Sequence, residues 1–183
     1  MVEQIFITFG VVLLAAVFSA AGLAKIRSID TLEGVVQNFR VLPTRLARPF
    51  ALVLPPAEIA VAAALVVPAT RAYGAGAAAA LLLVFTIAIA INLARGRREI
   101  DCGCFSSDLK QTLSGWLVTR NAVLAACAVG LMVLLADPAS VPPTWAAWLL
   151  GALGVGFTTL LYLTATTLAS VAATAARRRA AAG

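Results

Sequence analysis

The chain has 183 residues, of which 62% are hydrophobic and only 12% are charged. This composition excludes an ordinary soluble domain, in which roughly a quarter of the residues carry charge. The formal net charge is +6, but no basic stripe with interleaved aromatic residues accompanies it, so no nucleic acid is expected as a partner. The sequence has no histidine, which excludes histidine-based metal sites, catalytic triads and imidazole proton shuttles within the chain.

Long apolar runs predict an all-α integral membrane protein, a helical bundle with the lipid bilayer as its surroundings. About 20 apolar residues cross a hydrocarbon core of roughly 30 Å as a helix, and continuous apolarity disfavours strands. The first run follows Met1-Val2-Glu3-Gln4, which lacks the positive region of a signal peptide, so this span is expected to stay in the mature protein. Spans are expected at residues 5–24, 50–69, 74–94, 117–136 and 145–169.

The stretch after the first span predicts a short amphipathic helix on the membrane surface. Apolar residues recur at helical spacing over residues 29–41, and Leu42-Pro43 is expected to end the helix. Gly22, with the small residues before it, is expected to permit close helix packing. We therefore expect a four-helix membrane domain at residues 1–136, followed at residues 137–183 by a fifth transmembrane helix and a basic tail.

Glu58 stands out because it lies inside the second apolar span, shortly after Pro55-Pro56. Proline inside a helix removes a backbone hydrogen bond and bends the helix. A carboxylate at membrane depth needs a partner or a proton, and such residues often mark functional sites. Two interpretations therefore stand side by side: a role in a site, or a structural pairing with Lys25 or Arg95.

The connection between the third and fourth spans holds Cys102 and Cys104, separated by Gly103. A disulfide between them would close a strained small ring, and strain makes a disulfide easier to reduce. The same two thiols could instead bind copper, zinc or mercury as soft ligands, or be inert. Three cysteines are too few for a disulfide framework or a four-thiolate zinc site, so no resident metal site is assigned. Cys127 is either a small buried apolar residue or a third thiol.

Polar residues from several helix ends are expected at the same membrane face as the cysteine pair. Such a cluster could orient the thiols or form a pocket for a ligand, and a quinone is the ligand considered; no cofactor is assigned. The expected members are Lys25, Glu58, Asn92, Arg95, Arg120 and Asn121.

Basic residues predict the orientation in the membrane. Lysine and arginine number five in residues 25–49, four in 95–116 and three in the tail, whereas the alternate segments hold only Arg71. The positive-inside rule therefore puts the amino terminus outside, and the carboxyl terminus and the cysteine loop in the cytoplasm. Stable disulfides are uncommon there, so a transient, catalytic disulfide is the form expected.

A series of short motifs resembles the methylamine-utilisation MauE family, which is related to DoxX-like membrane proteins. The resemblance spans about residues 5–135, and the cysteine segment is its most specific element. Family members often have glycine after the phenylalanine of that segment, whereas this chain has Ser106-Ser107. In chain order the motifs are Ser19-Ala20-Ala21-Gly22-Leu23-Ala24-Lys25, Phe39-Arg40-Val41-Leu42-Pro43, Leu54-Pro55-Pro56-Ala57-Glu58, Asn92-Leu93-Ala94-Arg95-Gly96, Asp101-Cys102-Gly103-Cys104-Phe105 and Arg120-Asn121.

The resemblance implies a membrane protein that assists disulfide formation or maintenance in methylamine dehydrogenase together with a thioredoxin-like partner. It implies Cys102 and Cys104 as redox residues, with Glu58, Asn92, Arg95 and Arg120 as supporting residues. Two rivals stay open: a heavy-metal carrier or transporter that uses the same thiols, and a non-catalytic membrane scaffold subunit. Function inferred from a shared architecture is an analogy, and a site must support it.

Overall fold

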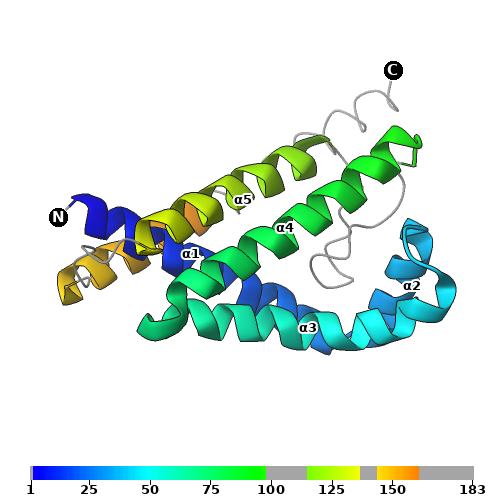
Figure 1. Ribbon diagram of the computed structural model, residues 1–183, viewed down its shortest axis with the longest axis horizontal. Coiled ribbons are helices and arrows are strands. Elements are labelled where there is room, and N and C mark those ends of the chain that lie inside the picture. The colour runs from blue at the N-terminus through cyan, green and yellow to red at the C-terminus, as the bar shows by residue number, and fades with distance from the viewer. Residues whose placement is uncertain (1, 98–114, 137–143, 161–183) are drawn as a thin grey trace, which may run out of the picture. The chain divides into compact units, whose positions relative to one another are not determined.

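A computed structural model describes residues 2–97, 115–136 and 144–160 of the chain, and throughout these ranges the regular structure is helical (Figure 1). The all-α prediction is confirmed. The elements are α1 (Val2–Ile26), α2 (Ile29–Phe39), α3 (Thr44–Val66), the 3-10 turn η1 (Pro68–Thr70), α4 (Arg71–Ala94), α5 (Gly115–Ala136) and a shorter apolar helix at Trp145–Leu160.

Within the described ranges, four helices are long and apolar enough to cross a membrane, and the chain is accordingly a multi-pass membrane protein. The candidate spans are Glu3–Ile26, Thr44–Val66, Pro68–Ala94 and Gly115–Ala136. Their outer faces carry large exposed apolar side chains, as expected for helices surrounded by lipid rather than water. The described part of the fifth apolar helix, Trp145–Leu160, is shorter than these spans, so a fifth crossing stays a prediction.

The second span begins earlier than its hydropathy suggests. The expected span starts at residue 50, but α3 begins at Thr44, directly after Pro43. Proline fixes φ near the value that a helix start accepts, and Pro43 has φ −57°. The first turns of α3 carry exposed arginines, including Arg48. The hydropathy of these first turns is therefore low, although they are continuous with the apolar part of α3.

The chain divides into two compact units, one formed by Gly10–Pro142 and the other by Met1–Phe9 together with Pro143–Gly183. In the smaller unit, a Cβ atom on Gly151 would lie 3.0 Å from the carbonyl carbon of Thr8. Glycine at this position therefore permits a close contact with the backbone at Thr8.

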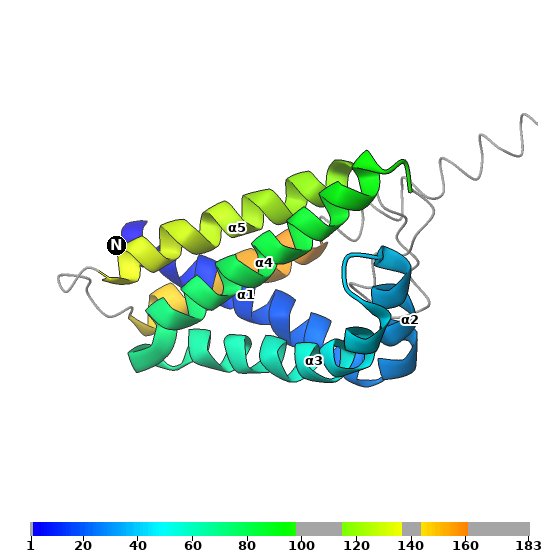
Figure 2. The same cartoon turned by 45° about the vertical axis from the view of Figure 1, so that its right-hand side comes forward.

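In the larger unit, α3 and α4 form a hairpin through η1, and α5 packs along α4 in the opposite direction (Figures 1 and 2). Gly74 of α4 lies against the backbone of α3, where an added Cβ would stand 2.8 Å from the Leu65 nitrogen. The surface helix α2 packs on α3 through a buried cluster of Leu32, Ala51 and Leu54. Consequently the ends of α1 and α4, the start of α5 and the whole of α2 lie toward one end of this unit.

Candidate functional site

Lys25 and Glu58 form a buried ion pair between the end of α1 and the middle of α3. The Lys25 Nζ donates to both carboxylate oxygens of Glu58, at 2.7 and 2.9 Å. Their side chains are 8% and 1% exposed. Of the two partners expected for Glu58, the structure therefore gives Lys25. An ionised group inside a membrane helix is costly without a partner, and this geometry provides one for each charge.

Gly22 brings α1 close enough to α3 for this ion pair to form. A Cβ on Gly22 would lie 2.8 Å from Cγ1 of Ile59 and 3.1 Å from the Pro55 carbonyl oxygen. Lys25 follows Gly22 by three residues, and Glu58 follows Pro55 by three residues, so the close contact and the ion pair lie on matching faces of the two helices. The small patch in the first span is thus a helix contact that also positions Lys25.

Lys25 also forms part of the wall of an apolar cavity of about 290 Å³. Its Nζ lies 5.6 Å from the centre of the Phe85 ring, within the range of a cation–π interaction. Phe39 and Phe50 contribute two more aromatic rings to the wall. The lining residues come from the end of α1, from α2 and the connection after it, and from α3 and α4.

Asn92 is a fully buried amide on α4. Its Nδ2 donates to the carbonyl oxygen of Ala88 at 3.0 Å, whereas its Oδ1 has no hydrogen-bond partner among the described residues. One turn earlier, Ile89 packs in a buried cluster with Leu117 of α5. Asn92 therefore lies nearer to the end of the helix pair than this cluster, and it presents a free acceptor oxygen there.

The end of α4 is fixed by a Schellman motif. The Gly96 nitrogen donates to the Leu93 carbonyl at 2.9 Å and the Arg97 nitrogen donates to the Asn92 carbonyl at 3.0 Å. Gly96 has φ +73°, which favours glycine because a Cβ is disfavoured in this region. The helix thus ends in a defined conformation immediately before the segment that carries the cysteine pair.

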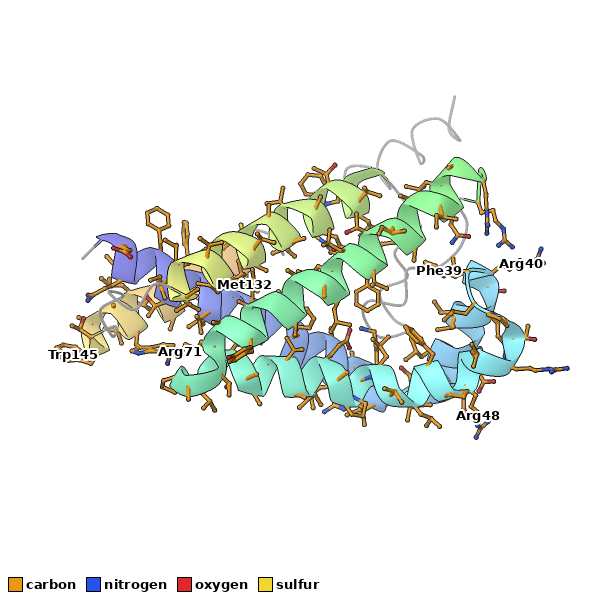
Figure 3. The ribbon with its side chains drawn as sticks, viewed as in Figure 1. Phe39, Arg40, Arg48, Arg71, Met132 and Trp145 are labelled. Carbon is orange, nitrogen blue, oxygen red and sulfur yellow. The ribbon has the colours of Figure 1, made fainter. Side chains whose placement is uncertain are left out.

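Two arginines then connect this helix end to the surface helix. Arg95 Nη1 donates to the Arg40 carbonyl at 3.2 Å, and Arg97 Nη1 donates to the Asn38 carbonyl at 2.9 Å. Figure 3 shows Phe39 and Arg40 at the end of α2 that faces α4. Arg95 is exposed and bonds to the end of α2, and among the described residues the Glu58 carboxylate is paired with Lys25 and not with Arg95. The structure therefore places it at the rim of the predicted cluster.

The predicted residues of α5 lie deeper along the helix pair. Asn121 is buried, and Arg120 is half-buried with its Nε atom lacking a hydrogen-bond partner among the described residues. Ile89 of α4 packs with Leu117 of α5, and the two helices run in opposite directions. Asn121 therefore lies beside Phe85, roughly 10 Å along the helix axis from Asn92. The cluster is thus spread over different depths.

Cys127 is a free, exposed thiol on α5. The expectation of a small buried apolar residue is wrong for this position, because the thiol lies on a face of α5 that no described segment covers. Cys102 and Cys104 lie outside the described residues. Their role stays a prediction, as does the role of each polar residue in it.

Comparison with known proteins places the chain in a family. The profile of the methylamine utilisation protein MauE family matches residues 3–136. The chain belongs to the MauE family. No solved structure matches it.

Three curated MauE proteins are similar to this chain over most of its length. The methylamine utilization protein MauE of Paracoccus versutus is 49% identical over 87% of this chain and 85% of its own. That of Paracoccus denitrificans is 46% identical over 88% and 86%, respectively. That of Methylorubrum extorquens is 44% identical over 92% and 90%. The family profile covers α1 to α5, and therefore includes the ion pair and the apolar cavity.

Some features of this MauE-family site are not predicted by the sequence motifs. Phe85 is one of them, although it precedes Asn92 by seven residues and so shares a helix face with a predicted site residue. Phe39 and Phe50 are separated in the sequence and meet at the cavity only through the packing of α2 on α3. Arg97 could have been found from its place directly after Gly96 at a helix end.

Proposed function

We propose that this MauE-family protein acts in methylamine utilisation as a membrane-embedded thiol-disulfide redox protein. Cys102 and Cys104 exchange electrons with a thioredoxin-like partner and so support disulfide formation in a protein such as methylamine dehydrogenase. The assignment to methylamine utilisation follows from the names of the related proteins. The thiol chemistry comes from the Cys-Gly-Cys segment and its family resemblance.

The observation that carries the proposal is the set of polar groups at the helix end that precedes the cysteine segment. α4 ends at Ala94 in a fixed conformation, and α5 begins at Gly115 toward the same end of the pair. Toward this end of the unit lies the buried Asn92 amide, and deeper, near Phe85, lies the Lys25–Glu58 ion pair. Buried polar groups in a membrane helix are costly, and such groups mark functional sites more often than ordinary packing.

The proposed exchange conserves atoms and electrons. A thiolate on one cysteine of the pair attacks a sulfur of the partner's disulfide, and a mixed disulfide forms while the partner's other sulfur leaves as thiolate. The second cysteine then attacks the mixed disulfide, which releases the partner as a dithiol and leaves Cys102 and Cys104 joined. In the reverse direction, the Cys102–Cys104 disulfide accepts two electrons from the partner's thiols. Disulfide formation in a substrate uses this reverse direction.

The proposed orientation places the cysteine segment on the cytoplasmic side. Exposed arginines gather at the end of the larger unit that carries α2, among them Arg27, Arg40, Arg45, Arg48 and Arg95. Figure 3 shows Arg48 at this end and Arg71 at the opposite end of the α3–α4 hairpin. By the positive-inside rule the arginine-rich end faces the cytoplasm. The amino terminus then lies outside and the carboxyl terminus inside.

Trapping of the mixed disulfide tests the function directly. Purified full-length protein carrying Cys102→Ser or Cys104→Ser is mixed with an oxidised thioredoxin-like protein and separated without reductant. We expect one of the two variants to accumulate a covalent adduct, because the resolving thiol has been removed. The wild-type protein should instead exchange without a lasting adduct, and alkylation of its thiols should report two electrons transferred per pair.

The control is the variant with both Cys102→Ser and Cys104→Ser, which should form no adduct and exchange no electrons. Absence of an adduct with either single variant, together with no exchange by the wild type, contradicts the proposal. Bound metal in the purified protein without thiol cycling would favour the heavy-metal carrier. Biological activity that survives the double substitution would favour the scaffold.

A further inference from the structure

The apolar cavity beside Lys25 opens toward the lipid-facing surface of α4. Val84 and Ile87 line it, yet they are 52% and 57% exposed. Both residues lie inside the membrane span Pro68–Ala94, and Ile87 is seven residues before its end. A cavity wall that continues into an exposed apolar helix face at this depth admits molecules from the bilayer. A ligand that reaches the cavity by this route must dissolve in the membrane.

The wall also indicates what kind of group fits inside. Phe39, Phe50 and Phe85 supply three aromatic rings from three different helices, and aromatic pairs favour stacked or edge-to-face arrangements. The volume of about 290 Å³ lies at the small end for ligand pockets. It suits a single ring system with its chain extending into the bilayer.

Lys25 gives the cavity one polar contact. An ammonium group has three N–H donors, and two of them bond to the Glu58 carboxylate. The third has no hydrogen-bond acceptor among the described residues, and the Nζ lies 5.6 Å from the Phe85 ring centre. The unused donor and the positive charge complement an acceptor oxygen on the ring.

From these observations we infer that the cavity binds the ring of a membrane-dissolved quinone, which enters past the exposed side chains of Val84 and Ile87 and places a carbonyl oxygen toward Lys25. The role of the ligand rests on the proposed function, in which the Cys102 and Cys104 dithiol must be reoxidised after each substrate disulfide has formed. Two thiols lose two electrons and two protons and become a disulfide. The quinone takes up the same two electrons and two protons and becomes a quinol.

Photolabelling of the full-length protein in lipid nanodiscs tests the binding site. The probe is an azido-benzoquinone with a short isoprenoid tail, and the label is mapped on α4 by mass spectrometry. We expect labelling near Val84 and Ile87 that an unlabelled short-chain benzoquinone displaces. A dimethoxybenzene with the same tail, which lacks the carbonyl oxygens, should compete at least about tenfold less well, because it loses a charge-assisted hydrogen bond.

Matched substitutions on α4 separate the cavity from the lipid face. Ala88 lines the cavity, whereas Ala90 is exposed and does not. Ala88→Phe should abolish the displaceable label, and Ala90→Phe should leave it unchanged. Ile87→Trp obstructs the exposed opening without filling the core, and so gives the same test if Ala88→Phe fails to fold. Labelling that survives both Ala88→Phe and Ile87→Trp overturns the inference.

Two further outcomes are decisive. If a saturated acyl-chain probe labels the same residues and the benzoquinone does not displace it, the cavity holds a phospholipid tail and the inference is wrong. The variant with Cys102→Ser and Cys104→Ser should still bind the quinone. If this double variant binds the quinone but the wild type exchanges no thiols, the proposed function alone fails. If the wild type exchanges thiols but shows no displaceable labelling, the quinone site alone fails.

Discussion

Lys25 of α1 and Glu58 of α3 are joined by two hydrogen bonds that the Lys25 ammonium donates to the Glu58 carboxylate, at 2.7 and 2.9 Å, although 33 residues separate them in the chain. Both side chains are buried in a protein whose outer faces are apolar. In such surroundings each charge is tolerated chiefly because the other is present. Removal of one charge should therefore do more harm than removal of both.

The first prediction concerns the two single substitutions of this pair. Lys25→Met leaves the Glu58 carboxylate buried and unpaired, and Glu58→Leu leaves the Lys25 ammonium unpaired. We expect Lys25→Met to lower the free energy of unfolding by roughly 3–5 kcal/mol, the usual effect of breaking a buried ion pair. Glu58→Leu should lower it by less, because the long Lys25 side chain lies at the end of α1 and can reach the membrane surface. The unfolding temperature of purified protein in detergent measures the effect.

The variant that carries both substitutions is the informative control. It replaces the ion pair by apolar side chains, so most of the lost stability should return. The surface pair of half-buried Glu33 and exposed Arg48, with a 3.6 Å separation, provides a second comparison, because Glu33→Gln should change stability by less than about 1 kcal/mol. A double variant as unstable as the sum of the singles would show that the charges act independently.

The second prediction concerns Gly22, where α1 approaches α3. Gly22→Ala adds a Cβ only 2.8 Å from Ile59 Cγ1 and 3.1 Å from the Pro55 carbonyl oxygen. The helices must separate, and we expect a loss of about 1–3 kcal/mol from overpacking together with weaker pairing of Lys25 with Glu58. The unfolding temperature reports the loss.

Gly34 of α2 is the matched control, because no atom lies within 4 Å of an added Cβ there. Gly34→Ala should stabilise the helix by roughly 0.5–1 kcal/mol through its higher helix propensity. A similar gain at position 22 would mean that α1 and α3 are not in close contact at Pro55.

The third prediction concerns the end of α4. Gly96→Ala puts a Cβ into a backbone conformation with φ +73°, which costs roughly 1–2 kcal/mol for residues other than glycine. We expect a destabilised helix end and altered rates of thiol alkylation in the cysteine segment that follows. Gly96→Asn should be milder, since asparagine tolerates this conformation better. Equal effects of alanine and asparagine would argue against a conformational cause.

The fourth prediction concerns orientation. In a variant without native cysteines, Arg48→Cys places a single thiol near the start of α3, and Tyr73→Cys places one near the start of α4, at the opposite end of the α3–α4 hairpin. Both residues are exposed. A membrane-impermeant maleimide should label Tyr73→Cys in intact cells and should reach Arg48→Cys only after permeabilisation. The reverse pattern, or external labelling of native Cys102 or Cys104, contradicts the charge count.

The fifth prediction concerns Cys127. Because this thiol is exposed on α5, Cys127→Ser should leave the unfolding temperature and the rate of thiol exchange unchanged. Stopped-flow exchange with a thioredoxin-like protein measures the rate. A loss comparable with that of Cys102→Ser would make Cys127 a third redox thiol despite its position.

Much of the fold could be predicted because helices in a membrane leave a local signal. Continuous apolar runs identify α1, α3, α4 and α5. The position of Glu58 within an apolar span indicates that its carboxylate requires a partner. The choice of Lys25 over Arg95 could not be predicted from sequence, because it depends on how closely α1 approaches α3 at Gly22.

The start of α3 and the apolar cavity had weaker signals. Arg48 makes the first turns of α3 polar, so hydropathy places the start too late. The cavity depends on Phe39, Phe50 and Phe85, which come from α2, α3 and α4. No periodicity within one helix reports such a meeting, since it follows from packing between distant parts of the chain.

The depth of each charge in the ion pair has a consequence for biosynthesis. Lys25 lies one residue before the end of α1, so its long side chain can reach the membrane surface before any partner exists. Glu58 lies fourteen residues after Thr44 and eight before Val66, and its shorter side chain has no such escape. Because α1 leaves the ribosome before α3, Lys25, which can reach the membrane surface without a partner, is inserted first. Assembly in the order of synthesis therefore supplies Glu58 with a cation when it enters the bilayer.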